Sequence, residues 1–485
     1  MRARVFALLV LYGCSLYLIG QAATPSPAAD DTPKLVVALF RHGIRSPTPN
    51  FSQTDADKHS RDKWPAVEDW KVMSPGVPPD CDPGTSKSDP SKGWGYLTIH
   101  GQQVVQGLGA YYGKYYKKGA WKDGFNIYFW ADGANQRTRE TAKALAAGLK
   151  MAGLPDNKVT VDSLPGCAND PLFHPFRSHC GKSTGDALPN FATDLNNNWK
   201  TWAKNTYPSE FRQLYDVLNC FDTTQCSLPL SQDTPKANAC LAFTADCTAP
   251  IQWKEMYSYA SSATEGFLLE YANKMDVGWK RVDPAKDGKL QSMLKLHEFY
   301  FDKTDRFLGD NKQANPELAG IEGSNLIREI LDQLNRKATG RTATRCPRAE
   351  AKSDFVGLVG HDTNLAGVGA LLGLEWQFDD KNLPADTFGL PANDALPAGA
   401  LVFELRQRTD GTYVVRVEYV TQSLDQMRNG PKAEAFRLAV DGMACEQKRP
   451  CEIPLEKFQQ LVQKRIGSKF LSDCAGHEQT CGPAL

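Results

Sequence analysis

Three short apolar runs define the predicted architecture of the chain. Residues 34–40, 125–131 and 355–359 are mainly apolar runs of strand length, which indicates buried β-strands. Residues 138–150 and 365–372 follow the second and third runs and have the composition of crossover helices. Strands that alternate with helices predict an α/β fold with a mostly parallel sheet.

Two longer segments have apolar residues at helical spacing. In residues 101–117 these are Val104, Leu108, Tyr111 and Tyr115, and in the second segment they are Leu326, Ile327, Ile330, Leu331 and Leu334, with Gly340 beyond them as a stop signal. Such stripes are typical of amphipathic helices. We expect both to face the core.

Later segments depart from the strand-helix alternation. Residues 400–408 and 413–420, joined by a turn around Gly411, predict an antiparallel hairpin. From about 156 to 287 turn residues, cysteines and short helical pieces such as 262–274 replace the alternation. Residues 74–93, rich in Pro, Gly, Ser and Asp, predict a long loop that overhangs the site.

The predicted fold is therefore a three-layer α/β domain, with a mostly parallel central sheet flanked by helices and a smaller, mainly α-helical inserted subdomain. Its two parts are residues 31–150 and 291–485, and the insertion is residues 151–290.

Composition is that of a soluble globular protein. The 485 residues are 41% hydrophobic, and 56 Lys and Arg balance 56 Asp and Glu. No overall field draws the protein to nucleic acid or to an anionic membrane, so attraction for an anionic ligand must be local.

The N-terminus predicts a secretory signal peptide over residues 1–23. Arg2 and Arg4 precede an apolar stretch from about 5 to 19, which ends in small and polar residues. The stretch is shorter than the ~20 residues that span a bilayer. A lipoprotein cleavage box ending at Cys14 is the alternative; the bulky Tyr12 and the apolar residues beyond Cys14 disfavour it.

Removing Cys14 from the 13 cysteines leaves an even number in a chain directed to an oxidising compartment, which favours disulfides. Cys220 with Cys226, Cys240 with Cys247, and Cys445 with Cys451 are close in sequence; spacing does not define the pairing. A structural zinc site is disfavoured because the chain lacks C-x-x-C pairs and clustered histidines.

Charged residues directly follow each of the three apolar runs. These are Arg41 and His42, the cluster from Asp132 to Arg137, and His361 with Asp362. Ligands of open α/β sheets bind beyond the carboxyl ends of the strands. The three clusters are expected to share one edge of the sheet.

The first cluster carries the strongest chemical pattern. In Arg41-His42-Gly43-Ile44-Arg45-Ser46-Pro47 two guanidinium groups flank one imidazole. Arginine matches phosphate oxygens with planar donors and stays charged, and a neutral histidine nitrogen can attack phosphorus. The motif predicts phosphoryl transfer through a phosphohistidine, with the second ring nitrogen of His42 donating to a nearby carbonyl.

This R-H-G-x-R-x-P motif resembles the signature of the histidine acid phosphatases, branch 2 of the histidine phosphatase superfamily. The segment 360–364, Gly-His-Asp-Thr-Asn, resembles the second signature of that family. The resemblance implies an α/β domain with a smaller α domain over the site, no metal and no cofactor. It implies His42 as nucleophile, Asp362 as the acid that protonates the leaving oxygen, and phosphate binding by Arg41, Arg45, Thr48, Arg137 and His361. Arg139 competes with Arg137 for its role.

Segments 170–173, 264–269, 360–366 and 401–404 look most like the periplasmic bacterial acid phosphatases and phytases. Pro49 departs from the lysine typical of these phytases, and losing a cation weakens the grip on a highly phosphorylated inositol. The substrate stays open between phytate, a sugar phosphate and a broad range of esters. Glu265 and His297 are candidate pocket residues, or equally surface or domain-interface structure.

The sequence as a whole predicts a secreted or periplasmic phosphomonoester hydrolase, monomeric, acting on a phosphorylated small molecule. No nucleic acid partner and no stable membrane association after signal cleavage are expected. A mutase-like transferase is disfavoured by the leader and the cysteines. A two-metal phosphohydrolase is disfavoured because the 8 histidines are scattered. A catalytically silent anion-binding protein remains the alternative from another class.

Overall fold

The computed structural model describes residues 33–48, 62–73, 93–117, 121, 125–164, 170–174, 207–219, 253–284, 286–306, 316–340, 352–376, 395–430, 436–442 and 451–466. Among these residues, no helix combines the length and the apolar character needed to cross a membrane. The predicted leader, residues 74–92 of the predicted loop and every cysteine except Cys451 lie outside the described residues. The disulfide pairings therefore stay predictions.

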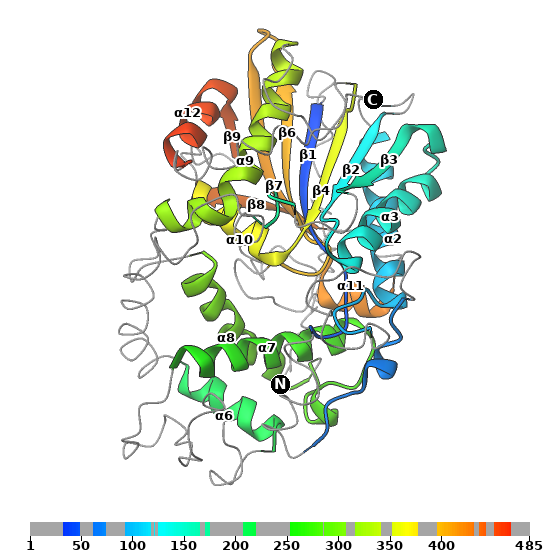
Figure 1. The fold of residues 1–485 in the computed structure, drawn as a ribbon, viewed down its shortest axis with the longest axis vertical. Helices are drawn as coiled ribbons and strands as arrows, with labels where there is room; N and C mark the ends of the chain where they lie inside the picture. Colours follow the sequence, from blue (N-terminus) through cyan, green and yellow to red (C-terminus); the bar gives the residue numbers. More distant parts are fainter. Residues whose placement is uncertain are drawn as a thin grey trace, which may run out of the picture.

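The centre of the protein is one mixed β-sheet (Figure 1). Its strand order is β3-β2-β4-β1-β6-β7-β8-β5, with β9 paired to β7. The strands are β1 (Pro33–Arg41), β2 (Ile127–Ala131), β3 (Val159–Ser163), β4 (Phe355–Gly360), β5 (Leu374–Trp376), β6 (Ala400–Gln407), β7 (Tyr413–Thr421), β8 (Phe436–Gly442) and β9 (Cys451–Pro454).

The α/β class is confirmed, but the sheet is less parallel than predicted. β1, β2, β3 and β4 pair in parallel, whereas every described pairing beyond β1, starting with β6, is antiparallel. The predicted hairpin is β6 and β7, and it extends the sheet next to β1. Strands joined by short turns run antiparallel, since parallel pairing needs a crossover.

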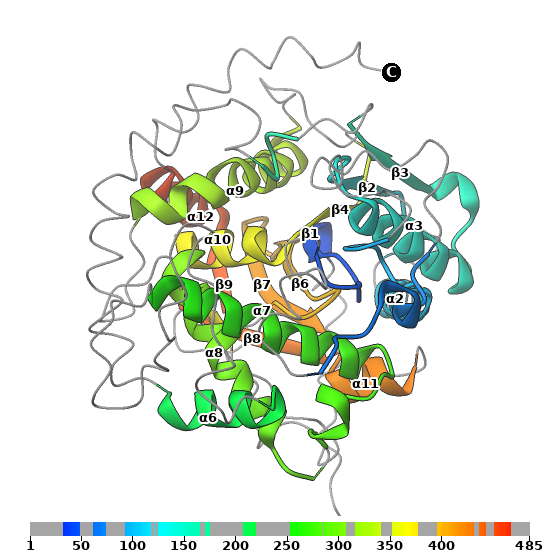
Figure 2. The ribbon, with the colours of Figure 1, turned by 60° about the horizontal axis from the view of Figure 1, so that its bottom comes forward.

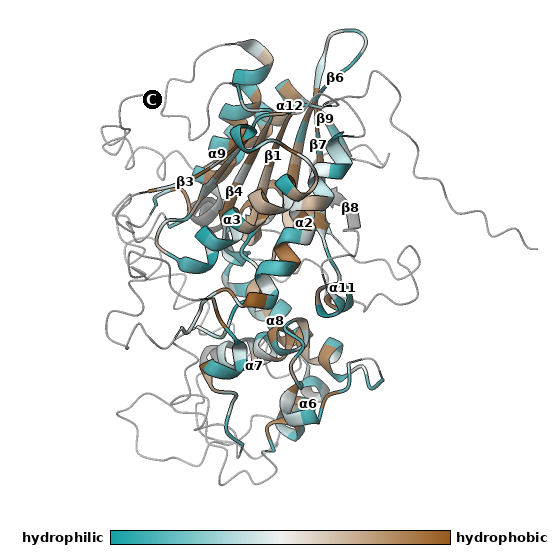
Figure 3. Cartoon of the chain, turned by 90° about the vertical axis from the view of Figure 1, so that its right-hand side faces the viewer, coloured by the Kyte–Doolittle hydropathy of each residue, from teal (hydrophilic) through white to brown (hydrophobic). Residues whose placement is uncertain are grey.

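Both faces of the sheet are buried. Successive side chains of β1 point to opposite faces, and each set packs against its own layer of helices. Val36, Ala38 and Phe40 pack against α2 (Ile99–Lys117) and α3 (Gln136–Met151). Leu35, Val37 and Leu39 face the opposite layer, formed by α9 (Pro316–Thr339), α10 (Asp362–Leu372) and α12 (Leu455–Arg465). In Figure 3 the strands are largely apolar in colour, and the helices around them carry polar residues. The predicted three layers are those observed.

The two predicted amphipathic helices differ in outcome. In α9 the whole stripe from Leu326 to Leu334 is buried, and the helix ends at Thr339, as predicted. In α2 the predicted stripe is confirmed at Val104 and Leu108, which are buried. It is wrong by one position at the tyrosines, because Tyr112 and Tyr116 are buried on Phe355 whereas Tyr115 is 38% exposed. Tyr111 and Tyr115 lie directly before Tyr112 and Tyr116 in the sequence. The sequence pattern therefore did not distinguish which pair of tyrosines faces the core.

A group of helices lies beyond the carboxyl ends of the parallel strands (Figures 1 and 2). It contains α6 (Pro208–Val217), α7 (Trp253–Ala272) and α8 (Lys289–Thr304). The predicted boundaries of 151 and 290 do not follow this group closely. β3 falls inside the predicted insertion yet pairs with β2, and α8 falls almost wholly outside it yet packs on α7. The remaining elements are α11 (Leu424–Asn429) and the 3₁₀ turns Val67–Trp70, Asp156–Lys158 and Gly278–Lys280.

Candidate active site

The three charged clusters meet at one edge of the sheet. Arg41, the last residue of β1, pairs with Gly360, the last residue of β4, and Ala131 at the end of β2 pairs with Val359. The residues that follow these strands therefore come from three separate parts of the chain and lie side by side. The shared edge was predicted from the strand ends.

His42 lies at the floor of the site, 2% exposed. Its Nδ1 is 2.9 Å from the carbonyl oxygen of Gly43, and because a carbonyl can only accept, Nδ1 carries the proton. This is the expected backbone partner, and it leaves Nε2 with a free lone pair. Burial lowers the pKa of His42 well below its ordinary value, and Arg137, Arg41, Arg45 and His361 lower it further. The ring is therefore a neutral base or nucleophile.

Backbone contacts fix the turn that carries His42. The His42 amide donates to Gly360 O, and the His42 carbonyl accepts from Ala398 N, both at 2.9 Å. Glycine is required next, since a Cβ on Gly43 would lie 2.6 Å from a side-chain carbon of Val105. The Gly43 amide donates a hydrogen bond to Thr141 Oγ1 at 2.9 Å, which also fixes this turn.

Arg41 and Arg45 are almost completely buried and share the carboxylate of Glu265. Arg45 Nη2 lies 2.9 and 3.1 Å from the two oxygens of Glu265, and Arg41 Nη2 donates to the same carboxylate. Asp362 Oδ2 lies 2.8 Å from Arg41 Nη2. Arg41 is further fixed through Nη1, which donates to Ala395 O at 2.6 Å. Glu265, on α7, therefore links the helical group to the sheet.

These cations keep both carboxylates ionised. Burial alone would raise the pKa of Asp362, but Arg41 and Arg45 bring that pKa well below its ordinary value. Arg45 and Arg41 likewise lower the pKa of Glu265 against the effect of its burial. Asp362 can thus accept a proton only when an added negative charge offsets the guanidinium groups.

The structure separates the two competing arginines at the start of α3. Arg137 points to the site, where its Nη2 lies 3.5 Å from His361 Nδ1. Arg139 Nη1 instead donates to the carbonyl oxygen of Gly133 in the preceding turn. Residues two apart in a helix point in different directions, so only Arg137 joins Arg41 and Arg45 around His42.

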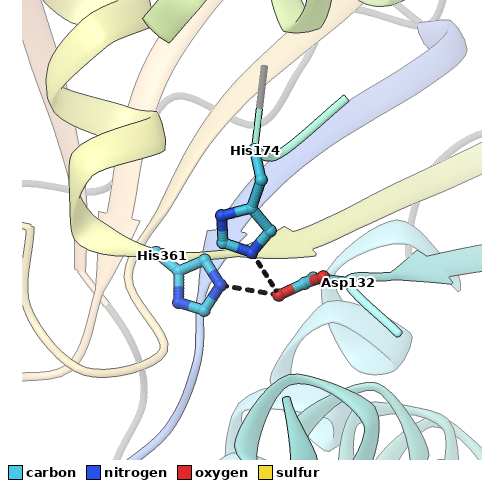
Figure 4. Close-up of side chains that lie close together, drawn as sticks. All are labelled: Asp132, His174 and His361. Carbon is cyan, nitrogen blue, oxygen red and sulfur yellow. Dashed lines mark hydrogen bonds and ion pairs between the residues drawn. The ribbon is translucent and has the colours of Figure 1, made fainter. Parts of the chain in front are cut away.

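His361 reaches the site from the start of α10. Its amide donates to Asn364 Oδ1 at 2.9 Å, and its ring centroid lies 5.7 Å from that of His42. Its Nε2 is 2.8 Å from Asp132 Oδ2, and His174 Nε2 is 2.8 Å from the same oxygen. Figure 4 shows both rings turned toward this carboxylate.

Opposing effects set the charges of this group. Burial lowers the pKa of His361 to about 4, although the hydrogen bond to Asp132 acts in the other direction. Burial alone would raise the pKa of Asp132, but the hydrogen bonds from His174 and His361 bring it well below its ordinary value. Asp132 is therefore a carboxylate that serves two imidazoles.

Asp132, His174 and His361 are also residue types that bind metals, and their ligand atoms lie within 4.8 Å of one another. Ligands about 2.0–2.1 Å from a tetrahedral zinc ion are roughly 3.3 Å apart. The two nitrogen-oxygen distances of 2.8 Å are shorter, and the Arg137 guanidinium beside His361 disfavours another cation. We describe the three residues as a hydrogen-bonded group.

The remaining predicted residues lie near this centre. Thr48 is half-buried, three residues beyond Arg45 on the same turn. His297 is buried on α8, where its Nδ1 lies 2.8 Å from Ser261 Oγ on α7. It therefore links two helices, and it also lines a small cavity together with Ala366 and Ala395.

Sequence reasoning missed the parts played by Asp132 and His174. Asp132 follows a predicted strand, which was the signal available for it, and His174 directly follows the family-like segment 170–173. Nothing in the spacing brings either to His361, since 229 residues separate Asp132 from it.

The assembled group can bind a tetrahedral anion. Three guanidinium groups and one imidazole surround the free nitrogen of a neutral histidine, and a carboxylate lies within reach of a guanidinium. Such a site can stabilise negative charge on transferring oxygens and supply a nucleophile and a proton donor.

A family model and several known proteins match this chain. Residues 34–420 match the model of the histidine phosphatase superfamily (branch 2). Phytase AppA of Escherichia coli (strain K12) is 29% identical over 432 residues, which cover 84% of this chain and 85% of the relative.

Solved structures give the same fold. The phytase from Citrobacter braakii has a TM-score of 0.67 and 26% identity, covering 90% of this chain and 99% of that one. Hafnia alvei phytase in complex with tartrate has a TM-score of 0.66 and 22% identity, covering 91% of this chain and 99% of that one.

Proposed function

The chain belongs to branch 2 of the histidine phosphatase superfamily and is a phosphoric monoester hydrolase, and we propose that it works through a phosphohistidine at His42. The observation that carries this proposal is the hydrogen bond from His42 Nδ1 to Gly43 O. It fixes the tautomer in which Nε2 is an unprotonated nucleophile, within a ring of cationic side chains.

In the first step His42 Nε2 attacks phosphorus, and the bond between phosphorus and the ester oxygen breaks. The electron pair of that bond goes to the leaving oxygen, which takes a proton from Asp362. The proposal assigns Arg41, Arg45, Arg137 and His361 to the phosphate oxygens, where their charge offsets the negative charge of the transition state. Thr48 is assigned to substrate binding further out on the same turn.

In the second step water attacks the phosphohistidine. Asp362, now a carboxylate, takes a proton from the water, the bond from phosphorus to Nε2 breaks, and its electron pair returns to the ring. Inorganic phosphate leaves, and both groups are restored.

The protonation of Asp362 links the mechanism to pH. In the free protein Arg41 and Arg45 hold the pKa of Asp362 low. A bound phosphate group adds negative charge beside these cations, so the proton on Asp362 becomes more stable in the complex. Protonation is lost as the pH rises, and we therefore propose an acid phosphatase.

The proposal also covers the substrate and the cellular location of the protein. The Escherichia coli relative is called a phytase, which makes phytate the first ester to test. Pro49, without a positive charge, favours esters with fewer phosphates, such as sugar phosphates. The sequence pattern at the N-terminus supports secretion or a periplasmic location.

The test is turnover of p-nitrophenyl phosphate near pH 5 by the purified protein and by His42→Ala. We expect release by the first and none by the second, together with an acid-labile phosphoryl group on the first after rapid quenching. No release by the unsubstituted protein would favour a silent anion-binding protein. Release without a trapped phosphoryl group would contradict the phosphohistidine. A panel of inositol hexakisphosphate, sugar phosphates and nucleotides then ranks the substrates.

A further inference from the structure

The proposed mechanism leaves one buried feature without a purpose. Asp132 is completely buried, and its Oδ2 accepts a hydrogen bond from His361, which the mechanism uses, and a second from His174, which it does not. The two imidazole rings lie 5.1 Å apart between centroids. One negative charge therefore serves two groups that can each become positive (Figure 4).

The turn that carries His174 is held against both neighbouring elements. Asp170 starts the turn: its Oδ2 accepts from Trp130 Nε1 on β2 at 2.6 Å, and its carbonyl accepts from the His174 amide at 2.8 Å. The carbonyl of Phe173 accepts from Asn364 Nδ2 on α10 at 3.0 Å. β2 leads to Asp132 and α10 begins after His361, so His174 has a fixed place relative to both.

His361 has different surroundings on its two ring nitrogens. Nε2 donates to Asp132, whereas Nδ1 faces Arg137 and the proposed phosphate position. To donate to a phosphate oxygen from Nδ1 while keeping its bond to Asp132, the ring must be protonated on both nitrogens. Phosphate binding by His361 therefore includes the uptake of a proton.

The proton on His361 is opposed from several sides. Arg137 on α3 and His174 on the turn are the groups whose positive charge disfavours it, whereas the neighbouring ring of His42 is neutral. Asp132 favours it directly, and Asp362 contributes the opposite charge beside it in sequence. Of these two opposing groups, His174 is the one that competes for the same carboxylate oxygen.

We propose that His174 is a positioning residue that controls, through Asp132, how readily His361 takes up the proton with which it binds phosphate. This inference rests on the function proposed above. When His174 is protonated, its charge offsets that of Asp132, and His361 holds its own proton less strongly. At acidic pH His174 therefore limits the affinity for inorganic phosphate, the product of the reaction.

The charge balance of the site agrees with this assignment. The pKa of His361 is lowered first by burial and then, among other groups, by His174, while Asp132 raises it. Since the bound form carries the proton, phosphate affinity rises as the pH falls, and protonation of His174 makes that rise smaller.

The test replaces His174 with glutamine, whose amide nitrogen can donate to Asp132 but cannot become positive. Competitive inhibition by inorganic phosphate is measured from pH 4.5 to 8. We expect His174→Gln to bind phosphate on the order of tenfold more tightly than the unsubstituted protein at pH 5, from the loss of a charge about 5 Å away. At pH 8 the difference between the two proteins should disappear.

A matched control is His100→Gln, the same substitution at a half-buried histidine on α2 whose Nε2 lies 2.8 Å from Met427 O, outside the site. It should follow the unsubstituted protein at every pH. Equal inhibition profiles for His174→Gln and the unsubstituted protein would overturn the inference. Weaker binding by the same factor at all pH values would also overturn it, because that is the result of a merely structural role.

A second measurement does not depend on turnover. In protein labelled with ¹³C-histidine, the imidazole resonances of His174 and His361, assigned with single variants, are followed through a pH titration with and without inorganic phosphate. We expect phosphate to raise the pH at which His361 titrates, and His174→Gln to raise it further. If His174→Gln leaves the pH at which His361 titrates unchanged, the coupling is refuted. If the coupling is present but the protein shows no turnover, only the proposed function is contradicted.

Discussion

Glu270 offers a quantitative test of how burial controls charge in this protein. It lies on α7, 2% exposed, and its Oε2 accepts a hydrogen bond from Gly278 N at 2.8 Å. Burial raises the pKa of Glu270 from 4.5 to about 8, against that hydrogen bond and with a contribution from Asp276. The folded protein therefore holds this carboxyl group protonated at neutral pH, whereas the unfolded chain releases the proton.

The perturbation is Glu270→Gln, which keeps an oxygen for Gly278 N and cannot ionise. Between pH 4.5 and 8 the folded protein binds more protons at this position than the unfolded chain, so its stability falls as the pH rises. From pKa values of 4.5 and about 8, the loss between pH 4 and pH 7 is about 3 kcal/mol. Glutamine abolishes this loss.

The assay is urea unfolding of both proteins at pH 4, 5, 6 and 7, followed by tryptophan fluorescence. All other titrating groups are common to the two proteins, so only the difference in unfolding free energy is interpreted. We expect this difference to move in favour of Glu270→Gln by about 3 kcal/mol from pH 4 to pH 7. A difference that stays constant over this range would refute the reasoning, because Glu270 would then be ionised in the folded protein or equally protonated in both states.

Three further predictions concern the site and the packing around it. Asp362→Asn should reduce turnover of alkyl phosphates by about 10²–10⁴-fold and that of p-nitrophenyl phosphate much less, since only a poor leaving group needs the proton; equal losses in steady-state kinetics would contradict the acid role. Arg137→Ala should lower kcat/KM by roughly 10²–10³-fold. Arg139→Ala removes only a hydrogen bond to Gly133 and should change kcat/KM little. If Arg139→Ala has the larger effect, the roles of the two arginines are exchanged. Gly148→Ala should lower the free energy of unfolding by about 1–3 kcal/mol in thermal or urea unfolding, because its Cβ would lie 2.0 Å from Gln106 O where α2 and α3 touch. Lys143→Ala on the exposed face of α3 is the control, expected within about 0.5 kcal/mol of the unsubstituted protein.

The sequence alone determined the elements with strong local patterns. β1, β2 and β4 lie within two residues of the predicted runs, because buried parallel strands are nearly continuous apolar segments. It also placed Arg41, His42, His361 and Asp362 at strand ends, which by a general rule of α/β sheets meet at one edge. β3 escaped prediction, since its residues alternate between half-buried and exposed and form no apolar run.

Only the tertiary structure decided which charged residues, distant in the sequence, come into contact. Arg41 and Glu265 are 224 residues apart, and Arg137 and His361 are also 224 apart. Local pattern carries no information about such pairs, because they depend on how whole layers pack. The choice of Arg137 over Arg139, the meeting of His174 with His361 at Asp132, and the burial that leaves His42 neutral all follow from packing, which brings charges together and removes water from between them.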